Sequence, residues 1–105
     1  MHSRIGIPIN NPAAYAVSKS GLNQLTRWLA STLAPSIRVN AVAPGLIDTE
    51  IHAKAGDASR VDRLMPSVPL GRVGGAEEVA QTVMWLLSEK SSYISGSIVP
   101  VSGGR

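Results

Sequence analysis

The chain has 105 residues and a net charge of +3, and its 44% hydrophobic and 16% charged residues exclude a disordered chain and predict one small domain. The basic residues are scattered and no apolar run approaches the ~20 residues of a membrane span, so we expect neither a nucleic-acid nor a membrane partner. The absence of Cys excludes disulfides and fits a cytoplasmic location, and the isolated His2 and His52 predict no metal site.

The first predicted element is a long helix over residues 13–33. Asn11-Pro12 supplies an N-cap followed by a proline at the first helical position, and Pro35 ends the helix. Leucines at spacings of three, four and four form one apolar stripe, which predicts core or a helix–helix seam. These leucines are Leu22, Leu25, Leu29 and Leu33.

Two short strands and a second helix follow. The β-branched run over 37–43 predicts a buried strand that ends at Pro44-Gly45. Residues 46–75 predict a long connection with at most one or two short helices. A second helix is predicted over 76–88 and a last strand over 97–101.

The order of these elements predicts the fold class. Helix, strand, long loop, helix and strand, with short strands that do not alternate in polarity, are typical of α/β proteins with a parallel sheet. Two strands cannot form a sheet that buries two helices. We therefore interpret residues 1–105 as the C-terminal portion of one doubly wound parallel-sheet domain.

Tyr15 and Lys19 are the first candidate site residues. Residues four apart lie on one face of a helix, about one turn from each other. A positive charge within ~4–6 Å favours the ionised form of a phenol, which makes such a pair a plausible proton donor and acceptor. An ordinary helix tyrosine with a packed ring remains the alternative on this evidence alone.

Four motifs follow one another at characteristic separations. They are Tyr15-x-x-x-Lys19, then Arg38-Val39-Asn40-Ala41-Val42-Ala43-Pro44-Gly45-x-Ile47-x-Thr49, then Pro69-Leu70-Gly71-Arg72-x-Gly74-x-x-Glu77-Glu78-Val79-Ala80, and finally Ser92-Tyr93-Ile94-x-Gly96 with Val101-x-Gly103-Gly104. Together they closely resemble the C-terminal portion of the short-chain dehydrogenase/reductase family, whose domains are Rossmann-type. The single-domain members, and among them glucose dehydrogenase-like and uncharacterised oxidoreductase members, are the most similar.

This resemblance implies an oxidoreductase that uses NAD or NADP and interconverts an alcohol and a carbonyl by hydride transfer. Tyr15 matches the family's general acid/base. Lys19 matches the lysine that holds the nicotinamide ribose and assists the tyrosine. The resemblance also implies a small-molecule alcohol or ketone as substrate and a homo-oligomer, dimer or tetramer, when the protein is full length.

The segment after the first strand is expected to complete the nicotinamide site. By the same resemblance, Pro44 and Gly45 pass the nicotinamide carboxamide, and the Ile47 backbone and the Thr49 side chain hydrogen-bond it. Taken alone, Pro-Gly after a strand is also simply a good turn. Residues 48–69 match the family's substrate lid, and its candidates to face the substrate are His52, Arg60, Arg63 and Met65.

Parts of the family pattern are missing from the chain. The Gly-x-x-x-Gly-x-Gly phosphate loop is absent, the catalytic serine is not found, and we do not assign its role to Ser3. We therefore expect this chain to be inactive alone and to belong to a longer enzyme. The alternative is a non-enzymatic remnant or interaction module that is stable only on a partner.

Overall fold

The computed structural model describes residues 12–48 and 58–105. Their helices and strands are, in chain order, α1 (Pro12–Leu33), β1 (Ala41–Pro44), β2 (Ile47–Asp48), α3 (Ala58–Leu64), the 3-10 turn η1 (Met65–Ser67), β3 (Gly74–Gly75), α4 (Ala76–Leu87), the 3-10 turn η2 (Glu89–Ser91) and β4 (Ile98–Val101). This order confirms the predicted α/β class.

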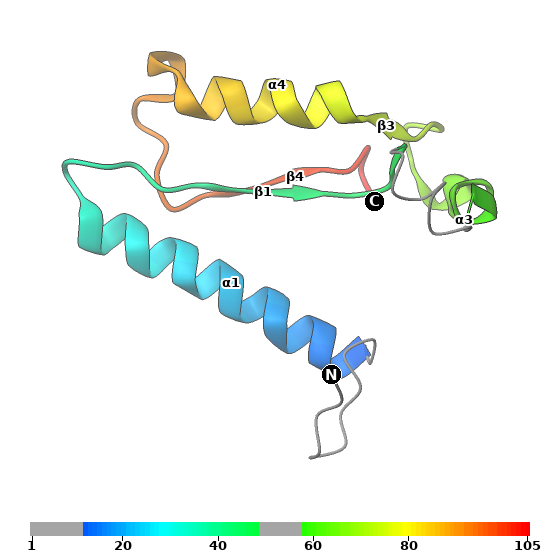
Figure 1. The fold of residues 1–105 in the computed structure, drawn as a ribbon, viewed down its shortest axis with the longest axis horizontal. Helices are drawn as coiled ribbons and strands as arrows, with labels where there is room; N and C mark the ends of the chain where they lie inside the picture. Colours follow the sequence, from blue (N-terminus) through cyan, green and yellow to red (C-terminus); the bar gives the residue numbers. More distant parts are fainter. Residues whose placement is uncertain (1–11, 49–57) are drawn as a thin grey trace.

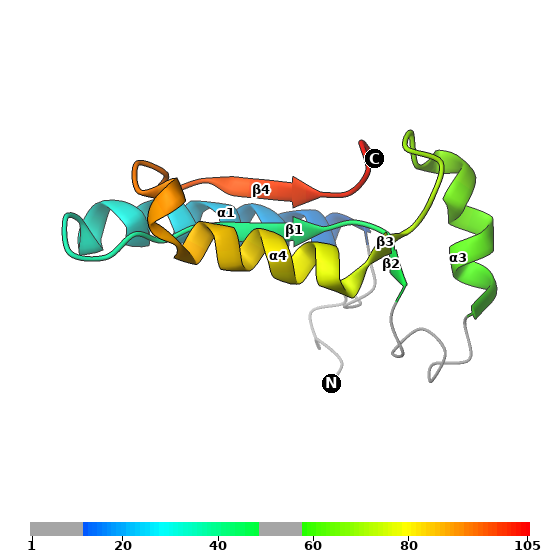
Figure 2. The same ribbon diagram turned by 90° about the horizontal axis from the view of Figure 1, so that it is seen from above.

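The elements form three layers around a short parallel sheet. β1 and β4 pair in parallel, with Ala41 opposite Ile98 and Pro44 opposite Val101. α4 lies on one face of this pair and α1 on the other (Figures 1 and 2). A second parallel pair, β2 with β3, continues beyond the carboxyl end of β1.

Both predicted long helices are confirmed. α1 begins at Pro12 and ends at Leu33, two residues before Pro35, because proline is tolerated in the first turn but cannot continue a helix. α4 spans Ala76–Leu87 and so ends one residue earlier than predicted. The acidic Glu77 and Glu78 lie in its first turn, where their negative charges are stabilised by the positive end of the helix dipole.

The predicted strand over 37–43 was wrong at its start, because β1 begins only at Ala41. Before that point, a backbone hydrogen bond runs from the Gly96 amide to the Val39 carbonyl oxygen at 2.7 Å, and side chains make further contacts. Asn40 Nδ2 donates to the Ile94 carbonyl oxygen at 2.9 Å, and the Ser97 amide donates to Asn40 Oδ1 at 3.0 Å. Residues 37–40 therefore lie beside the turn that precedes β4. The strand β4 itself begins at Ile98, one residue later than predicted.

The described part of the connection 46–75 agrees with the prediction of one or two short helices, which are α3 and η1. The prediction missed β2 and β3, each of two residues. Glycine has a low intrinsic preference for strands, so Gly74-Gly75 gives no local signal. The pairing depends on the approach of two distant segments.

The core is small in the described residues. Its buried apolar side chains are Ala30, Leu46, Ile47, Val68 and Leu86. The leucine stripe of α1 was wrongly expected in the core, because Leu22 and Leu25 are 64% and 47% exposed. The reason is that a sheet only two strands wide covers little of α1. The alternative interpretation, that these leucines form a helix–helix seam, stays a prediction. Within the described ranges, no helix is long and apolar enough to span a membrane.

Candidate functional site

A hollow of about 280 Å³ lies between the first half of α1 and β1. It runs along the whole of β1 and reaches the carboxyl end of this parallel strand at Pro44, and open α/β sheets bind ligands beside such ends. The helix supplies the polar side chains of the lining together with Leu22, and the sheet supplies an apolar wall. Its lining residues are Tyr15, Ser18, Lys19, Leu22, Asn23, Ala41, Val42, Ala43, Pro44 and Ile98.

Tyr15 and Lys19 share this hollow, as their four-residue spacing predicted. Lys19 Nζ lies over the Tyr15 ring, 5.9 Å from the ring centroid, within the range of a cation–π contact. The Tyr15 side chain is 64% exposed, so its hydroxyl is not sealed in the protein interior. The pair therefore presents a phenol and an ammonium side by side at an accessible site.

Sequence reasoning missed two polar residues of the hollow, Ser18 and Asn23. Asn23 continues the four-residue spacing of Tyr15 and Lys19 by one more turn, so that one helix face carries a phenol, an ammonium and an amide in succession. This spacing is a signal that could have identified Asn23. Ser18 precedes Lys19 and has no comparable signal.

The last residue of β1 and the residues after it lie in two different places. Pro44 lines the hollow with Tyr15. Gly45 does not, but its amide donates to the Val101 carbonyl oxygen at 2.9 Å, and a Cβ on it would lie 2.7 Å from Ser102 Cβ. Ile47 is 7% exposed and lines a separate hollow of about 50 Å³. The structure therefore brings Tyr15, Lys19 and Pro44 together and separates the Ile47 side chain from them.

Several other candidates lie outside this hollow or outside the described residues. Met65 lines another hollow, of about 290 Å³, with Asp62 and Val68. Arg63 is exposed on α3. Thr49, His52 and Ser3 lie outside the described residues, as does the side chain of Arg60.

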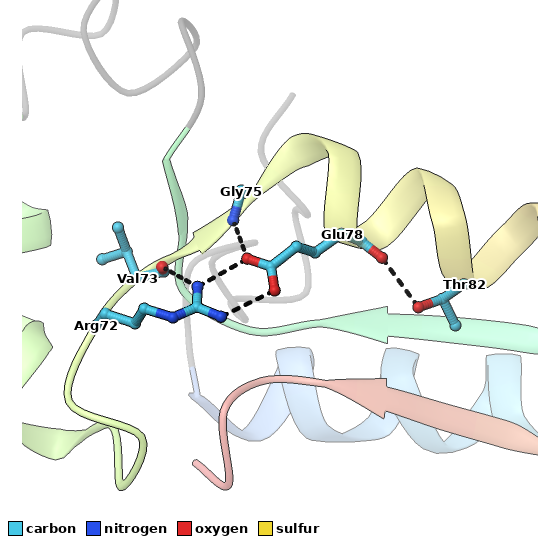
Figure 3. A network of polar contacts seen from close by, with 5 residues as sticks. All are labelled: Arg72, Val73, Gly75, Glu78 and Thr82. Atoms are coloured by element: carbon cyan, nitrogen blue, oxygen red, sulfur yellow. Dashed lines mark hydrogen bonds and ion pairs between the residues drawn. The ribbon is translucent and has the colours of Figure 1, made fainter.

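A second polar cluster joins Arg72 to Glu78 near β3 (Figure 3). The two side chains form a bidentate pair, at 2.7 Å for Nη1–Oε1 and 2.9 Å for Nη2–Oε2. The hydrogen bonds from Arg72, followed by the one from the Gly75 amide, lower the pKa of Glu78 to about 2. The same carboxylate raises the pKa of Arg72. Both groups therefore stay charged over the whole physiological range.

The sequence and the fold are both similar to those of known proteins. A family model described as enoyl-(acyl carrier protein) reductase matches residues 1–105. The chain belongs to the short-chain dehydrogenase/reductase family.

Three relatives show the extent of the similarity. The uncharacterized oxidoreductase YgfF of Escherichia coli is 47% identical over 104 residues, which cover 98% of this chain and 42% of that protein. Glucose 1-dehydrogenase 2 of Bacillus subtilis is 37% identical over 105 residues, or 99% of this chain and 40% of that protein. A putative 2-deoxy-D-gluconate 3-dehydrogenase from Agrobacterium tumefaciens, solved with bound NADP, superposes with a TM-score of 0.75 at 37% identity, over 86% of this chain and 37% of that one. The chain thus spans about two fifths of the length of these relatives.

Proposed function

We propose that the chain is the C-terminal portion of an NAD- or NADP-dependent oxidoreductase that interconverts an alcohol and a carbonyl. The observation that carries this proposal is that Tyr15, Lys19 and β1, up to its carboxyl end at Pro44, line one hollow. The NADP bound to the Agrobacterium relative and the dehydrogenase activity named for the Bacillus relative support it. The substrate class is a small-molecule alcohol or ketone.

The lining of the hollow fits the nicotinamide end of such a cofactor. Its apolar wall, from Ala41 to Pro44, suits the face of an aromatic ring, and Lys19 offers ammonium donors for ribose hydroxyls. When bound, the nicotinamide supplies or accepts the hydride. No metal is needed for this assignment.

Tyr15 transfers the proton. During reduction, negative charge develops on the carbonyl oxygen, and the Tyr15 hydroxyl gives its proton to that oxygen to form the alcohol. During oxidation, the tyrosine takes the alcohol proton as the carbonyl forms. A positioned general acid or base of this kind contributes about 10²–10⁴-fold to the rate.

Lys19 assists in two ways. Its ammonium stabilises the negative charge that Tyr15 carries after it has given up its proton, because opposite charges this close attract. It also holds the ribose hydroxyls by hydrogen bonds. Its place over the Tyr15 ring suits both tasks.

The turn after β1 is proposed to hold the nicotinamide carboxamide. Pro44 has no amide hydrogen and lies at the hollow, whereas Gly45 is held close to Ser102. By the family resemblance, the Ile47 backbone and the Thr49 side chain supply the hydrogen bonds to the carboxamide. Such contacts decide which face of the ring is presented to the substrate.

We also propose that the full-length enzyme is a homo-oligomer that pairs through α1. Trp28 is 61% exposed and Leu25 is 47% exposed. Trp28 lies two residues, or about 200° around the helix, from the buried Ala30, so the two side chains point to opposite sides. A second copy of α1 related by a two-fold axis would cover this face.

The isolated chain is proposed to be inactive. It contains no Gly-x-x-x-Gly-x-Gly loop to bind the cofactor's pyrophosphate. The proposal is therefore tested in a hybrid enzyme, in which this whole chain replaces the aligned segment of the Bacillus glucose 1-dehydrogenase 2. Formation of reduced cofactor is measured with NAD or NADP and with glucose and a panel of sugars and secondary alcohols.

We expect the hybrid enzyme to turn over and Tyr15→Phe to lower kcat by about 10²–10⁴-fold with little change in cofactor affinity. Lys19→Met should weaken cofactor binding as well as kcat. The matched controls are Tyr93→Phe and Lys90→Met, two exposed residues outside the hollow. Turnover that survives Tyr15→Phe, or a hybrid enzyme that binds no reduced cofactor, would contradict the proposal.

A further inference from the structure

The carboxylate of Glu78 holds the backbone around β3. Its Oε1 accepts hydrogen bonds from Arg72 Nη1 at 2.7 Å and from the Gly75 amide at 3.0 Å, and its Oε2 accepts from Arg72 Nη2 at 2.9 Å (Figure 3). Arg72 Nη1 also donates to the Val73 carbonyl oxygen at 3.2 Å. Both ends of the segment 72–75 are thereby attached to the first turn of α4.

β3 in turn determines the position of β2. Among the described strands, β3 is the one that pairs with β2. The Gly74 amide donates to the Leu46 carbonyl oxygen at 3.0 Å, and Gly74 lies opposite Ile47. The approach is so close that a Cβ on Gly74 would lie 2.8 Å from Ile47 Cδ1. A displacement of β3 would strain or break the hydrogen bond from the Gly74 amide to Leu46 and so loosen the adjacent Ile47 backbone.

The pairing of β2 with β3 is too short to be stable by itself, because isolated pairs of short strands are only marginally stable in water. The Arg72 and Glu78 side chains are 59% and 46% exposed. Exposed ion pairs contribute little to the stability of a whole protein. Loss of this pair should therefore loosen β3 and β2 locally and change the overall stability only slightly.

We propose that Arg72 and Glu78 are positioning residues for the cofactor, which hold the Ile47 backbone in place through β3 and β2. This inference rests on the proposed function, since that function gives the Ile47 backbone its contact with the nicotinamide carboxamide. Neither side chain lines the hollow of Tyr15. Their loss should therefore affect cofactor binding more than proton transfer.

The test uses the hybrid enzyme with Glu78→Ala, Glu78→Gln and Arg72→Met. The measured quantities are the KM for the cofactor, kcat, Tm and the hydrogen exchange of the Gly74 amide followed by mass spectrometry. Glu78→Ala should raise the cofactor KM about tenfold or more, since misplacement by ~1 Å can cost ~10²-fold. Gly74 exchange should accelerate, while Tm falls by less than about 3 °C.

Two variants serve as comparisons for Glu78→Ala. Glu78→Gln should be intermediate, because its amide oxygen can still accept from the Gly75 amide. Glu77→Ala removes an exposed carboxylate from the same helical turn and should leave the cofactor KM, kcat and Gly74 exchange unchanged, with only a small fall in Tm from the lost interaction with the helix dipole.

Unchanged cofactor KM and unchanged Gly74 exchange in Glu78→Ala would overturn the inference. A large fall in Tm with kcat and KM affected together would also overturn it, because the pair would then serve stability alone. Failure of the proposed function is seen separately as full activity of Tyr15→Phe. The exchange of Gly74 reports on β3 in either case.

Discussion

Arg38 binds Ser91 twice through one nitrogen: Arg38 Nη1 donates to the Ser91 carbonyl oxygen at 2.9 Å and to the Ser91 hydroxyl oxygen at 3.3 Å. Ser91 is only 1% exposed. Arg38 Nη2 donates to the carbonyl oxygens of Leu86 and Ser88 at 2.9 and 3.2 Å. The guanidinium thus joins the approach to β1 with the end of α4, where the carbonyls that have no partner within the helix carry partial negative charge.

Replacing Arg38 should destabilise the protein strongly. Arg38→Met keeps an apolar stem but removes every donor, so that several carbonyl oxygens lose a charged donor and keep only a neutral one. We expect the free energy of unfolding of the hybrid enzyme to fall by about 2–4 kcal/mol. Urea denaturation measures it, and Arg105→Met, at an exposed position, should change it by less than about 0.5 kcal/mol. Equal unfolding midpoints for the two variants would refute the structural role of Arg38.

Two glycines should respond to alanine with opposite signs. At Gly45 the new Cβ would meet Ser102 Cα at 2.8 Å, and such overpacking costs about 1–3 kcal/mol. At Gly21, inside α1, a Cβ meets nothing within 4 Å, and the gain in helix propensity is about 1 kcal/mol. Urea unfolding of both variants checks this, and tolerance of Gly45→Ala would show that Ser102 can move away.

The Arg72–Glu78 pair should persist in acid. Its carboxyl pKa lies at about 2 in the folded chain, below the ordinary 4.5, so its contribution to folding is complete above about pH 4.5 and is lost as the pH falls towards 2. NMR titration of the Glu78 carboxyl carbon should show this low midpoint. In Arg72→Met the midpoint should rise towards the ordinary value, and an unchanged midpoint would mean that Arg72 is not its cause.

A charge on the outer face of α1 should prevent assembly. Glu in place of Trp28 would be buried without a partner if two copies of α1 pack together, and burial of an unpaired charge is costly. Light scattering should therefore show a smaller mass for Trp28→Glu than for the parent hybrid enzyme. Tyr93→Glu, at a side chain that is 102% exposed, is the control. Identical masses for all three proteins would place the interface elsewhere.

The sequence predicted the helices well and the strands less well, for a physical reason. Helix boundaries depend on local signals, such as the prolines at 12 and 35, which act without distant partners. A strand requires a neighbouring backbone, and residues 37–40 lie beside a turn where Asn40 and Arg38 bind carbonyl oxygens instead. The β-branched pattern of residues 37–43 does not indicate that turn.

The candidate site likewise has residues that the sequence predicted and residues that only the structure revealed. Tyr15 and Lys19 were found because their spacing is a property of one helix. The contribution of Pro44 to the same hollow depends on how α1 packs against β1, and here the family resemblance supplied the expectation. Arg72 and Glu78 are six residues apart across a strand–helix junction, and no regular periodicity brings such positions together. Their pairing therefore emerged only from the three-dimensional arrangement.

The most direct test of the central claim is a crystal structure of the hybrid enzyme with NAD or NADP bound. The proposal predicts that the nicotinamide ring occupies the hollow between α1 and β1, with Lys19 Nζ hydrogen-bonded to the ribose and the Tyr15 hydroxyl beside the ring. A nicotinamide bound away from this hollow, with neither Tyr15 nor Lys19 in contact, would contradict it.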